Sequence, residues 1–361
     1  MWIVFSLTFL AASLTANLLE LLAFVIIRPF SVSLFRRVNA CLCYLHWSLI
    51  PWALDNWCNV ELRMFGIAED IEDIRKTNMI TVMNHRGDVD WMVGYSVGDR
   101  IKILQAIKSV MKSFVKYLPT LGWSFWFSDY VFVKRSFEHD KHSLQAATKQ
   151  WISYDFPWTV ILFAEGTRFT EEKHQKSLEY ASKMGLPELK YHLMPRTKGF
   201  NLIMKEIKNH VTAVCDLTVA YPRGVPSISN FIRGDKMYAD VNLRIIPISE
   251  VPVESEEELS SWLINLYKEK DDLVDYHHNH GRFPASIVDF PPRFMSTVVM
   301  TVWIVLLVVP FAFYVYTVVI AGAYWTLAIL VIIILAAQLG FRLLLTVSEV
   351  PRVAEVRKKE H

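Results

Sequence analysis

The sequence lacks the signatures of several common functional classes. Its four cysteines have neither metal-ligand spacing nor the pattern of a disulfide framework, and we interpret them as reduced structural residues: Cys41, Cys43, Cys58 and Cys215. No Asn-x-Ser/Thr site occurs, which is consistent with a body outside the secretory lumen. Neither the GxSxG elbow of serine hydrolases nor the GxxxxGK[ST] phosphate-binding loop is present. We therefore expect neither a serine hydrolase of this type nor a P-loop protein.

Charge is also scarce. Charged residues make up 20% of the 361 positions and hydrophobic residues 53%, a more apolar balance than soluble proteins usually have. The formal net charge is only +2, so nucleic acid is not an expected partner. The length suits one large domain or two small ones, and we find no internal repeat or low-complexity linker.

The apolar excess is concentrated near the C-terminus. No charged residue occurs from Met295 to Gly340. About 20 apolar residues cross a bilayer, so we predict a transmembrane helical hairpin within residues 291–342 that breaks near residues 321–323. Pro310 lies inside the first helix and would kink it. A buried pair of helices in a soluble core is the alternative.

A second apolar stretch, from Trp2 to Ile27, is interrupted only by Glu20. It lacks the basic start of a cleaved signal peptide, so we expect retained membrane-anchoring helices within residues 1–61. The positive-inside rule assigns the cytosol to the basic residues that follow, Arg28, Arg36 and Arg37. For Leu34 to Leu62, an interfacial helix and a re-entrant segment both stay open.

Basic residues also flank the predicted hairpin. Arg293 precedes it, and the basic tail of residues 343–361 ends in Lys358-Lys359-Glu360-His361. Flanking charge of this sign predicts that both ends are cytosolic. The two lysines resemble a dilysine retrieval signal, which predicts a multi-pass protein of the endoplasmic reticulum membrane. A solvated basic tail is the alternative.

Residues 62–290 alternate between short apolar strands and helical stretches. The candidate strands are Met79–Met83, Tyr130–Val133, Thr159–Phe163, Val211–Ala220 and Val241–Ile248. The candidate helices are Ile101–Tyr117, His139–Tyr154, Glu171–Met184 and Glu256–His280. Thr170 and Gly185 bracket the third helix as caps, and Ser255 with Glu258 forms a capping box for the last. The alternation predicts a cytosolic α/β domain with a mixed, mostly parallel sheet flanked by helices.

The first candidate strand ends in Asn84-His85, and Asp90 follows five residues after the histidine. On a regular helix these two side chains would lie about 140° apart. A turn through Gly87 must therefore bring the carboxylate back to the imidazole. A carboxylate on one ring nitrogen fixes the tautomer and makes the other nitrogen more basic, so we predict that His85 is a general base. A capping aspartate beside a solvated histidine is the alternative.

Two further strands end in cationic residues. Thr159–Phe163 runs into Glu165-Gly166-Thr167-Arg168, and Tyr130–Val133 ends in Lys134-Arg135. An arginine fork suits a phosphate group. Because reactive groups gather beyond the strand ends of open α/β sheets, this pattern predicts an anionic substrate beside the base.

Other polar residues carry weaker signals. Lys108, Lys112 and Lys116 suit the polar face of the helix predicted over Ile101–Tyr117, either solvated or against a membrane surface. The run from His277 to His280 is not expected to hold a metal. Three further histidines are expected at the surface: His139, His142 and His174.

Together these motifs resemble the glycerolipid acyltransferase family, most closely the eukaryotic lysophosphatidate acyltransferases of the gamma/delta type. The family's NHxxxxD block matches Asn84, His85 and Asp90, and its EGTR block matches residues 165–168. The block with the phosphate-binding arginine matches "YVFVKR", with Arg135 as that arginine, and the proline block matches "VAYP" with Pro222. The block with the phosphate-binding arginine commonly has Gly at its start and Asp before the arginine, where this chain has Asp129 and Lys134. This departure leaves the role of Lys134 open, but not that of Arg135.

The resemblance implies a reaction without a covalent acyl-enzyme, metal or cofactor, in which acyl-CoA is a substrate. His85, oriented by Asp90, would deprotonate the sn-2 hydroxyl of lysophosphatidate in the bilayer, and phosphatidate and CoA would be the products. The substrate-binding residues would be Arg135, Lys134, Glu165, Gly166, Thr167 and Arg168. Lysophosphatidylinositol or lysocardiolipin as acceptor is an alternative. A catalytically silent membrane scaffold is a second one, against which the intact His85–Asp90 pair argues.

Overall fold

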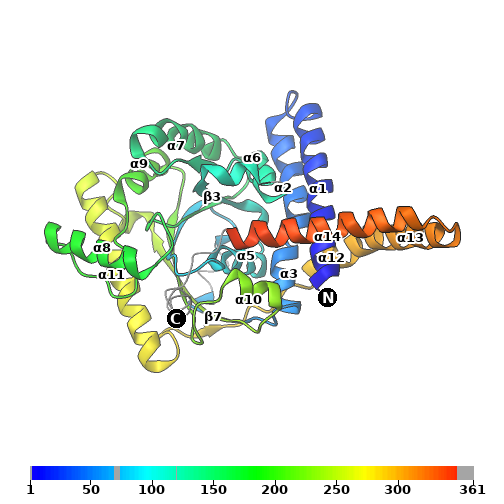
Figure 1. The fold of residues 1–361 in the computed structure, drawn as a ribbon. Helices are drawn as coiled ribbons and strands as arrows, with labels where there is room; N and C mark the ends of the chain where they lie inside the picture. Colours follow the sequence, from blue (N-terminus) through cyan, green and yellow to red (C-terminus); the bar gives the residue numbers. More distant parts are fainter. Residues whose placement is uncertain (1, 69–73, 119, 348–361) are drawn as a thin grey trace.

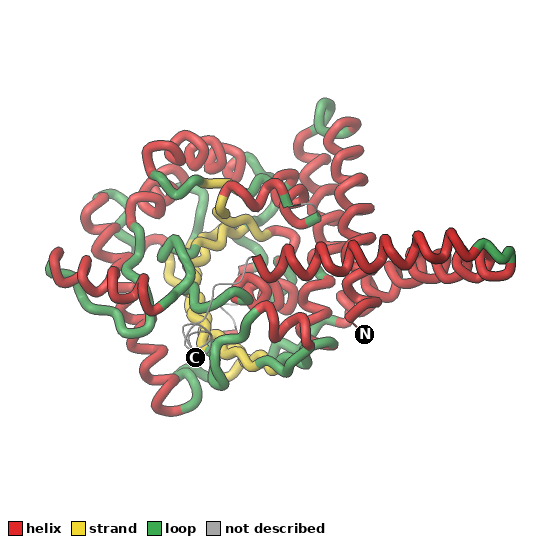
Figure 2. Tube along the Cα trace, viewed as in Figure 1, coloured by secondary structure: helices red, strands yellow, loops and turns green. Residues whose placement is uncertain are grey.

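The computed structural model describes residues 2–68, 74–118 and 120–347, and it places them around a central eight-stranded sheet (Figures 1 and 2). The strands follow the order β4-β3-β5-β2-β6-β7-β1-β8. Their bounds are β1 Glu61–Phe65, β2 Met79–Met83, β3 Ile107–Lys112, β4 Val131–Val133, β5 Thr159–Leu162, β6 Ala213–Ala220, β7 Tyr238–Pro247 and β8 Ile287–Val288. Neighbouring strands are parallel except in the pairs β6–β7 and β1–β8. The predicted mixed sheet with flanking helices is confirmed.

Helices cover both faces of this sheet and extend beyond it. They are α1 Trp2–Ile26, α2 Val32–Trp47, α3 Leu49–Asn56, α5 Asp90–Arg100, α6 Leu121–Phe127, α7 Phe137–Ile152, α8 Glu171–Met184, α9 Thr197–Ile207, α10 Ile228–Arg233, α11 Glu256–His280, α12 Phe294–Trp303, α13 Val309–Ile320 and α14 Tyr324–Val347. Within residues 62–290, helices α5, α6, α9 and α10 fall outside the predicted elements. The predicted caps of α8 are present, since Thr170 accepts the N–H of Lys173 and Gly185 is left-handed. Ser255 likewise accepts the N–H of Glu258 at the start of α11.

The strand that leads to His85 is buried on both faces. Ile80 and Val82 of β2 pack into the cluster formed with α7, α9 and α11. Met79 and Met83 point to the opposite face and pack with residues of α2 and α5. Burying one such side chain contributes about 1.5–3 kcal/mol. The end of β2 is therefore a rigid platform for the residues that follow it.

The helix predicted over Ile101–Tyr117 is wrong. This segment forms a short 3₁₀ turn, the strand β3, and a second 3₁₀ turn, Ser113–Tyr117. β3 lies between β4 and β5 and pairs with both in parallel. Lys108, expected on a polar helix face, is buried, with its ammonium 4.6 Å from the ring centre of Tyr154. Sheet pairing on two sides outweighs the helical spacing of the lysines, since strand residues gain backbone partners on both edges.

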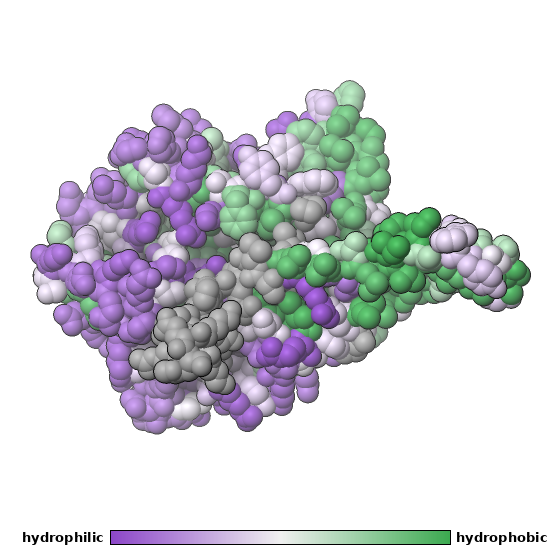
Figure 3. Space-filling view, in the orientation of Figure 1, coloured by the Kyte–Doolittle hydropathy of each residue, from purple (hydrophilic) through white to green (hydrophobic). Residues whose placement is uncertain are grey.

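Two described helical stretches are long and apolar enough to cross a membrane, Trp2–Ile26 and Phe294–Ile320. The first half of α1 packs through Phe5 and Phe9 against α3, α10 and α12. The surface view shows apolar residues over α1 and over the projecting α13 and α14 (Figure 3). Large exposed apolar patches mark interaction surfaces. These helices therefore give the protein membrane-associating surfaces.

The C-terminal helices have a local irregularity near the proline. A π-helical segment, Ile304–Val308, precedes α13, which has Pro310 in its first turn. Proline removes one helical N–H donor, and a π-bulge accommodates such a break. The chain turns at residues 321–323, where Gly322 has φ +66°, and α14 then runs beside α13 (Figure 1). The dilysine-like Lys358-Lys359 lies outside the described residues.

Candidate active site

The structure brings His85 and Asp90 into direct contact. His85 Nδ1 lies 2.8 Å from Asp90 Oδ2, and the Asp90 side chain is fully buried while that of His85 is 18% exposed. Because a carboxylate only accepts, Nδ1 carries the proton and Nε2 keeps a free lone pair. The His85 ring lies 4.4 Å from the ring centre of Phe163 at the end of β5. Geometrically, His85 is therefore able to accept a proton at Nε2.

Asp90 is held from three directions. Its Oδ2 also accepts the backbone N–H of Gly87 at 2.8 Å, and its Oδ1 accepts the hydroxyl of Tyr221 at 2.5 Å. A Cβ at Gly87 would come within 2.4 Å of Val225 Cγ1, so a larger residue in this turn would displace the valine side chain. Burial and the charge of Asp90 raise the pKa of Tyr221, which keeps its donor proton. The sequence analysis gave no role to Tyr221, although this residue directly precedes Pro222 in the proline block.

Two polar side chains hold the backbone on either side of the histidine. Asn84 bonds to β6 twice, donating to the C=O of Val219 at 3.0 Å and accepting its N–H at 2.7 Å. Glu165 accepts the N–H of His85 at 2.8 Å and that of Leu193 at 3.1 Å. Burial raises the pKa of Glu165 to about 8. The first residue of the EGTR block thus contacts the backbone of the predicted base.

Arg86 and a neighbouring segment support this arrangement from outside the predicted motifs. The Arg86 guanidinium donates to the C=O of Tyr191 and lies 4.4 Å from the ring centre of Phe169. Asp271 of α11 accepts the N–H groups of Lys190 and Tyr191, both at 2.7 Å. This carboxylate therefore anchors the segment that runs on to Leu193, whose N–H donates to Glu165. No spacing in the sequence connects Asp271 to the His85 loop.

The rest of the EGTR block forms a turn surrounded by cations. Gly166 has φ +71°, and its N–H bonds to the C=O of Phe163 at 2.9 Å. The Arg168 guanidinium pairs with Asp88 of the His85 loop. Lys173 of α8, which the sequence did not single out, donates to the Thr167 hydroxyl at 2.8 Å and to the C=O of Arg168 at 3.2 Å. Desolvation and the charges of Arg168 and Arg135 lower the pKa of Lys173.

Arg135 has an unusual backbone conformation after β4. Its φ is +66°, in the left-handed region. The buried Asp140 side chain accepts the N–H of Lys134 at 2.8 Å and that of Ser136 at 2.9 Å, one residue on each side of Arg135. Desolvation and the charges of Arg196 and Arg168 lower the pKa of Arg135. The structure thus brings Arg135 near Arg168, and the side chains of both Lys134 and Arg135 are exposed.

Of the three histidines expected at the surface, His139 and His142 are exposed. His174 is not: its side chain is buried, and its Nε2 lies 2.6 Å from the C=O of Leu189. The prediction for His174 was wrong because its position on α8 faces the chain segment that follows the helix. In the histidine run, His277 Nε2 lies 2.6 Å from Asp240 Oδ2. No cluster of three metal-ligating side chains occurs among the described residues.

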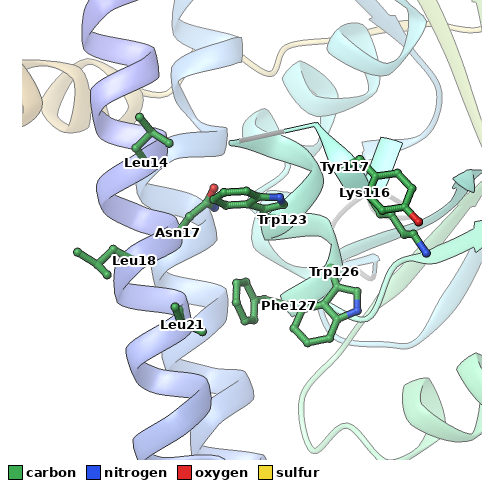
Figure 4. A pocket seen from close by; sticks show the side chains of 9 residues that line it. All are labelled: Leu14, Asn17, Leu18, Leu21, Lys116, Tyr117, Trp123, Trp126 and Phe127. Atoms are coloured by element: carbon green, nitrogen blue, oxygen red, sulfur yellow. The ribbon is translucent and has the colours of Figure 1, made fainter. Parts of the chain in front are cut away.

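An apolar cavity of about 550 Å³ lies between α1 and α6 (Figure 4). Leu14, Leu18 and Leu21 line it from α1, and Trp123, Trp126 and Phe127 line it from α6. Lys116 and Tyr117, at the end of the segment after β3, stand on another side. This segment follows the carboxyl end of β3, so it belongs to the same sheet edge as His85.

Comparison with known proteins places the His85 loop and the cations around Arg168 within the range of a family model. A family model described as Acyltransferase matches residues 67–221, and one described as Acyltransferase C-terminus matches residues 230–303. The chain is 34% identical to the mouse (Mus musculus) 1-acyl-sn-glycerol-3-phosphate acyltransferase delta over 351 residues, which cover 97% of this chain and 92% of that protein.

Two further relatives show the same similarity. The human (Homo sapiens) delta protein is 32% identical with the same coverage. The Arabidopsis thaliana 1-acyl-sn-glycerol-3-phosphate acyltransferase 3 is 36% identical over 277 residues, or 76% of this chain and 73% of that protein. The matched regions include the His85–Asp90 pair and the EGTR block. The chain therefore belongs to the glycerolipid acyltransferase family.

Proposed function

We propose that this protein transfers an acyl chain from acyl-CoA to the sn-2 hydroxyl of lysophosphatidate, giving phosphatidate and CoA. The observation that carries the proposal is the His85–Asp90 pair beside the cations around Arg168. The names of the relatives, all 1-acyl-sn-glycerol-3-phosphate acyltransferases, support the same acceptor.

In this mechanism His85 Nε2 takes the proton of the acceptor hydroxyl while its oxygen attacks the thioester carbonyl. The new C–O bond forms, the C–S bond breaks, and the sulfur of CoA receives the proton that His85 carries. Asp90 keeps the ring in the correct tautomer and stabilises its cationic form. General-base catalysis contributes roughly 10²–10⁴-fold, and the positioning of two substrates contributes more.

Arg168 and Arg135 bind the acceptor phosphate in this proposal. Arg168 belongs to the turn whose Phe169 N–H bonds to the C=O of His85 at 2.9 Å, so the guanidinium and the base share one set of loops. The hydroxyl and the phosphate of lysophosphatidate sit on adjacent glycerol carbons, which requires this proximity. Asp88 then holds the Arg168 fork in place until the phosphate binds.

The cavity between α1 and α6 is the proposed site for an acyl chain. Its lining is mainly leucine and aromatic side chains, and α1 exposes a row of apolar residues that suits contact with lipid. Lys116 on the opposite wall suits an anionic group at the membrane surface. A lipid acceptor can thus enter from the bilayer while acyl-CoA arrives from the aqueous side.

A panel of acceptors tests the proposal. The full-length protein in detergent and phospholipid micelles is supplied with one labelled acyl-CoA and with lysophosphatidate, lysophosphatidylinositol or lysocardiolipin. We expect release of CoA thiol and labelled phosphatidate, with the highest kcat/KM for lysophosphatidate. A higher kcat/KM for another acceptor would show that this other lysophospholipid is the preferred substrate. If acyl-CoA is not consumed with any of the three acceptors, the scaffold alternative would be favoured.

We further propose that the protein resides in the endoplasmic reticulum with its catalytic domain and C-terminus in the cytosol. Arg293 precedes and Arg342 follows the uncharged stretch of residues 295–340, and basic flanks face the cytosol. A tag placed after His361 should be digested by protease added to intact microsomes. Protection of this tag would contradict the topology and, with it, the retrieval-signal interpretation of the tail.

A further inference from the structure

Arg196 lies against the glycine of the EGTR block. It is the N-cap residue of α9, and its N–H donates to the C=O of Ala164 at 2.7 Å. A Cβ added to Gly166 would come within 2.9 Å of Arg196 Cδ and 3.0 Å of its Nε. The glycine therefore makes room for the arginine side chain as well as for the left-handed turn.

The cations on this side of the sheet surround one turn. Arg196 contacts Gly166, the ammonium of Lys173 bonds to Thr167 and to the C=O of Arg168, and the Arg168 guanidinium extends toward Asp88. The positive charges of Arg196 and Arg168 both act on Arg135. Asp88 pairs with Arg168 and the charge of Glu172 acts on Lys173, so these two carboxylates leave the four cations a formal excess of positive charge. Like charges at close range destabilise one another unless an anion binds.

Two of these guanidinium groups are available to a ligand. Within the described part of the chain, neither Arg135 nor Arg196 donates a side-chain hydrogen bond to a protein acceptor, and both side chains are exposed. Each is nevertheless fixed at its backbone, Arg135 by the bonds to Asp140 on both sides and Arg196 by its bond to Ala164. Planar forks held at their bases but open at their tips suit phosphate oxygens.

We propose that Arg196 completes, with Arg135 and Arg168, a site for a phosphomonoester dianion, and that Arg196 selects this group over a phosphodiester. A phosphomonoester offers three free oxygens and carries a charge of about −1.5 to −2 at pH 7. A diester offers two free oxygens and a single charge, so it gives three forks fewer acceptor oxygens and less negative charge to bind. The inference rests on the proposed function and narrows its acceptor to lysophosphatidate within the lysophospholipids.

The phosphomonoester has two chemical sources among the substrates, the head group of lysophosphatidate and the 3′-phosphate of CoA. The acceptor phosphate is one glycerol carbon away from the hydroxyl that His85 deprotonates. The 3′-phosphate is separated from the thioester by the whole pantetheine arm and the pyrophosphate. Because the cation cluster shares its turn with the His85 loop, the acceptor is the source that fits.

The variants Arg196→Ala and Arg196→Lys test the site in the full-length protein, with Lys198→Ala as the matched control. Lys198 is an exposed cation two residues further along α9. We expect Arg196→Ala to raise the KM for lysophosphatidate roughly ten-fold. The preference for the monoester, measured as the kcat/KM for lysophosphatidate divided by the kcat/KM for the diester lysophosphatidylglycerol, should fall to a similar extent. Arg196→Lys should recover part of the loss, and the KM for acyl-CoA should stay within about two-fold in all variants.

Three other results of these kinetic measurements would each change a different part of the proposal. If the KM for acyl-CoA rises and 3′-dephospho acyl-CoA abolishes the difference, the site binds a phosphomonoester but the donor is its source. Equal losses for the monoester and diester acceptors would overturn the selection of monoesters. Unchanged KM values for both substrates would overturn the site itself.

A binding measurement separates this inference from the proposed reaction. Glycerol 3-phosphate should raise the Tm of the wild type and of Lys198→Ala more than glycerophosphoglycerol does, in the absence of any acyl donor. Arg196→Ala should lose this difference while keeping the Tm of the ligand-free protein. A wild type that binds glycerol 3-phosphate but transfers no acyl chain would contradict the proposed function alone. Equal shifts for the two ligands would contradict the phosphomonoester site.

Discussion

The two sides of the candidate active site are held in different ways. On the base side, Asp90 is fully buried with three hydrogen bonds, Asn84 is bonded twice to β6, and Glu165 holds the backbone N–H of His85. On the cation side, Arg135 and Arg196 are exposed at their tips and fixed only through backbone bonds. The base side is complete within the protein, whereas the cation side leaves positive charge uncompensated.

The difference follows from what each side must do. A general base needs a fixed tautomer and a fixed distance before the substrate arrives, because misplacement by about 1 Å costs up to 10²-fold in rate. An anion site needs more positive charge than the protein itself neutralises: Asp88 pairs with Arg168, while the side chains of Arg135 and Arg196 stay exposed to the phosphate. We therefore expect variants on the base side to lower kcat and variants on the cation side to raise the KM of one substrate.

The largest effect is expected for His85→Ala, which removes the base. Turnover should fall by at least roughly 100-fold, with little change in Tm because the ring is partly exposed. Asp90→Asn should also lower kcat steeply. Asp90 accepts hydrogen bonds from His85, Gly87 and Tyr221, and the NH₂ group of an asparagine cannot accept the bond of the donor that it meets. His142→Ala, an exposed histidine on α7, is the control. More than a few per cent of wild-type kcat in His85→Ala would reject this residue as the base.

The sequence alone locates site residues at strand ends better than residues that reach the site from other elements. His85, Asp90 and the EGTR residues lie at strand ends, where periodicity and turn chemistry are readable, and the structure places His85 against Asp90. Asp140, Arg196 and Asp271 lie on other helices or loops and reach the site only through tertiary packing. The sequence around a charged residue on a helix does not show which loop this residue will contact in the folded protein.

The fold shows the same limit. The strands β2, β5, β6 and β7 were predicted from their apolar runs because burial on two faces leaves a clear pattern. The prediction for residues 101–117 was wrong because it took the helical spacing of Lys108 and its neighbours as a sign of a helix. A strand can carry lysines at the same spacing, and in β3 the Lys108 side chain is buried against Tyr154. In that segment pairing with two neighbouring strands, which is non-local, decided the structure.

A smaller effect is expected for Arg168→Lys, on the cation side. Lysine keeps the charge but loses the fork, and a lost charge-assisted hydrogen bond is worth about 1.5–3 kcal/mol. The KM for lysophosphatidate should rise several-fold while that for acyl-CoA stays nearly unchanged. A selective rise in the acyl-CoA KM would move Arg168 to the donor site and leave Arg135 as the main residue for the acceptor phosphate.

A still smaller effect is expected for Asp140→Asn, which acts on Arg135 through the backbone. Only one oxygen remains to accept the two N–H groups beside Arg135, so its left-handed conformation, which costs roughly 1–3 kcal/mol, loses part of its support. We expect a two- to five-fold higher KM for lysophosphatidate with kcat nearly unchanged. Ser136→Ala is the control, because the Ser136 side chain makes no cap bond to α7. A fall in kcat at unchanged KM would place Asp140 on the base side instead.

The smallest effect is a pH dependence of stability that originates at Glu165. Burial raises the pKa of this carboxyl from 4.5 to about 8, so between these values the folded protein holds a proton that the unfolded chain has lost. Stability from this group is therefore fully present below about pH 4.5 and is lost as the pH rises through about 8. Glu165→Gln stays neutral throughout, so its Tm in detergent should fall less between pH 5 and pH 8 than that of the wild type, by a few degrees. Glu179→Gln, an exposed carboxyl on α8, should keep the wild-type slope. The same slope in Glu165→Gln as in the wild type would show that Glu165 is ionised in the folded protein, and the base side would then carry an additional negative charge next to His85.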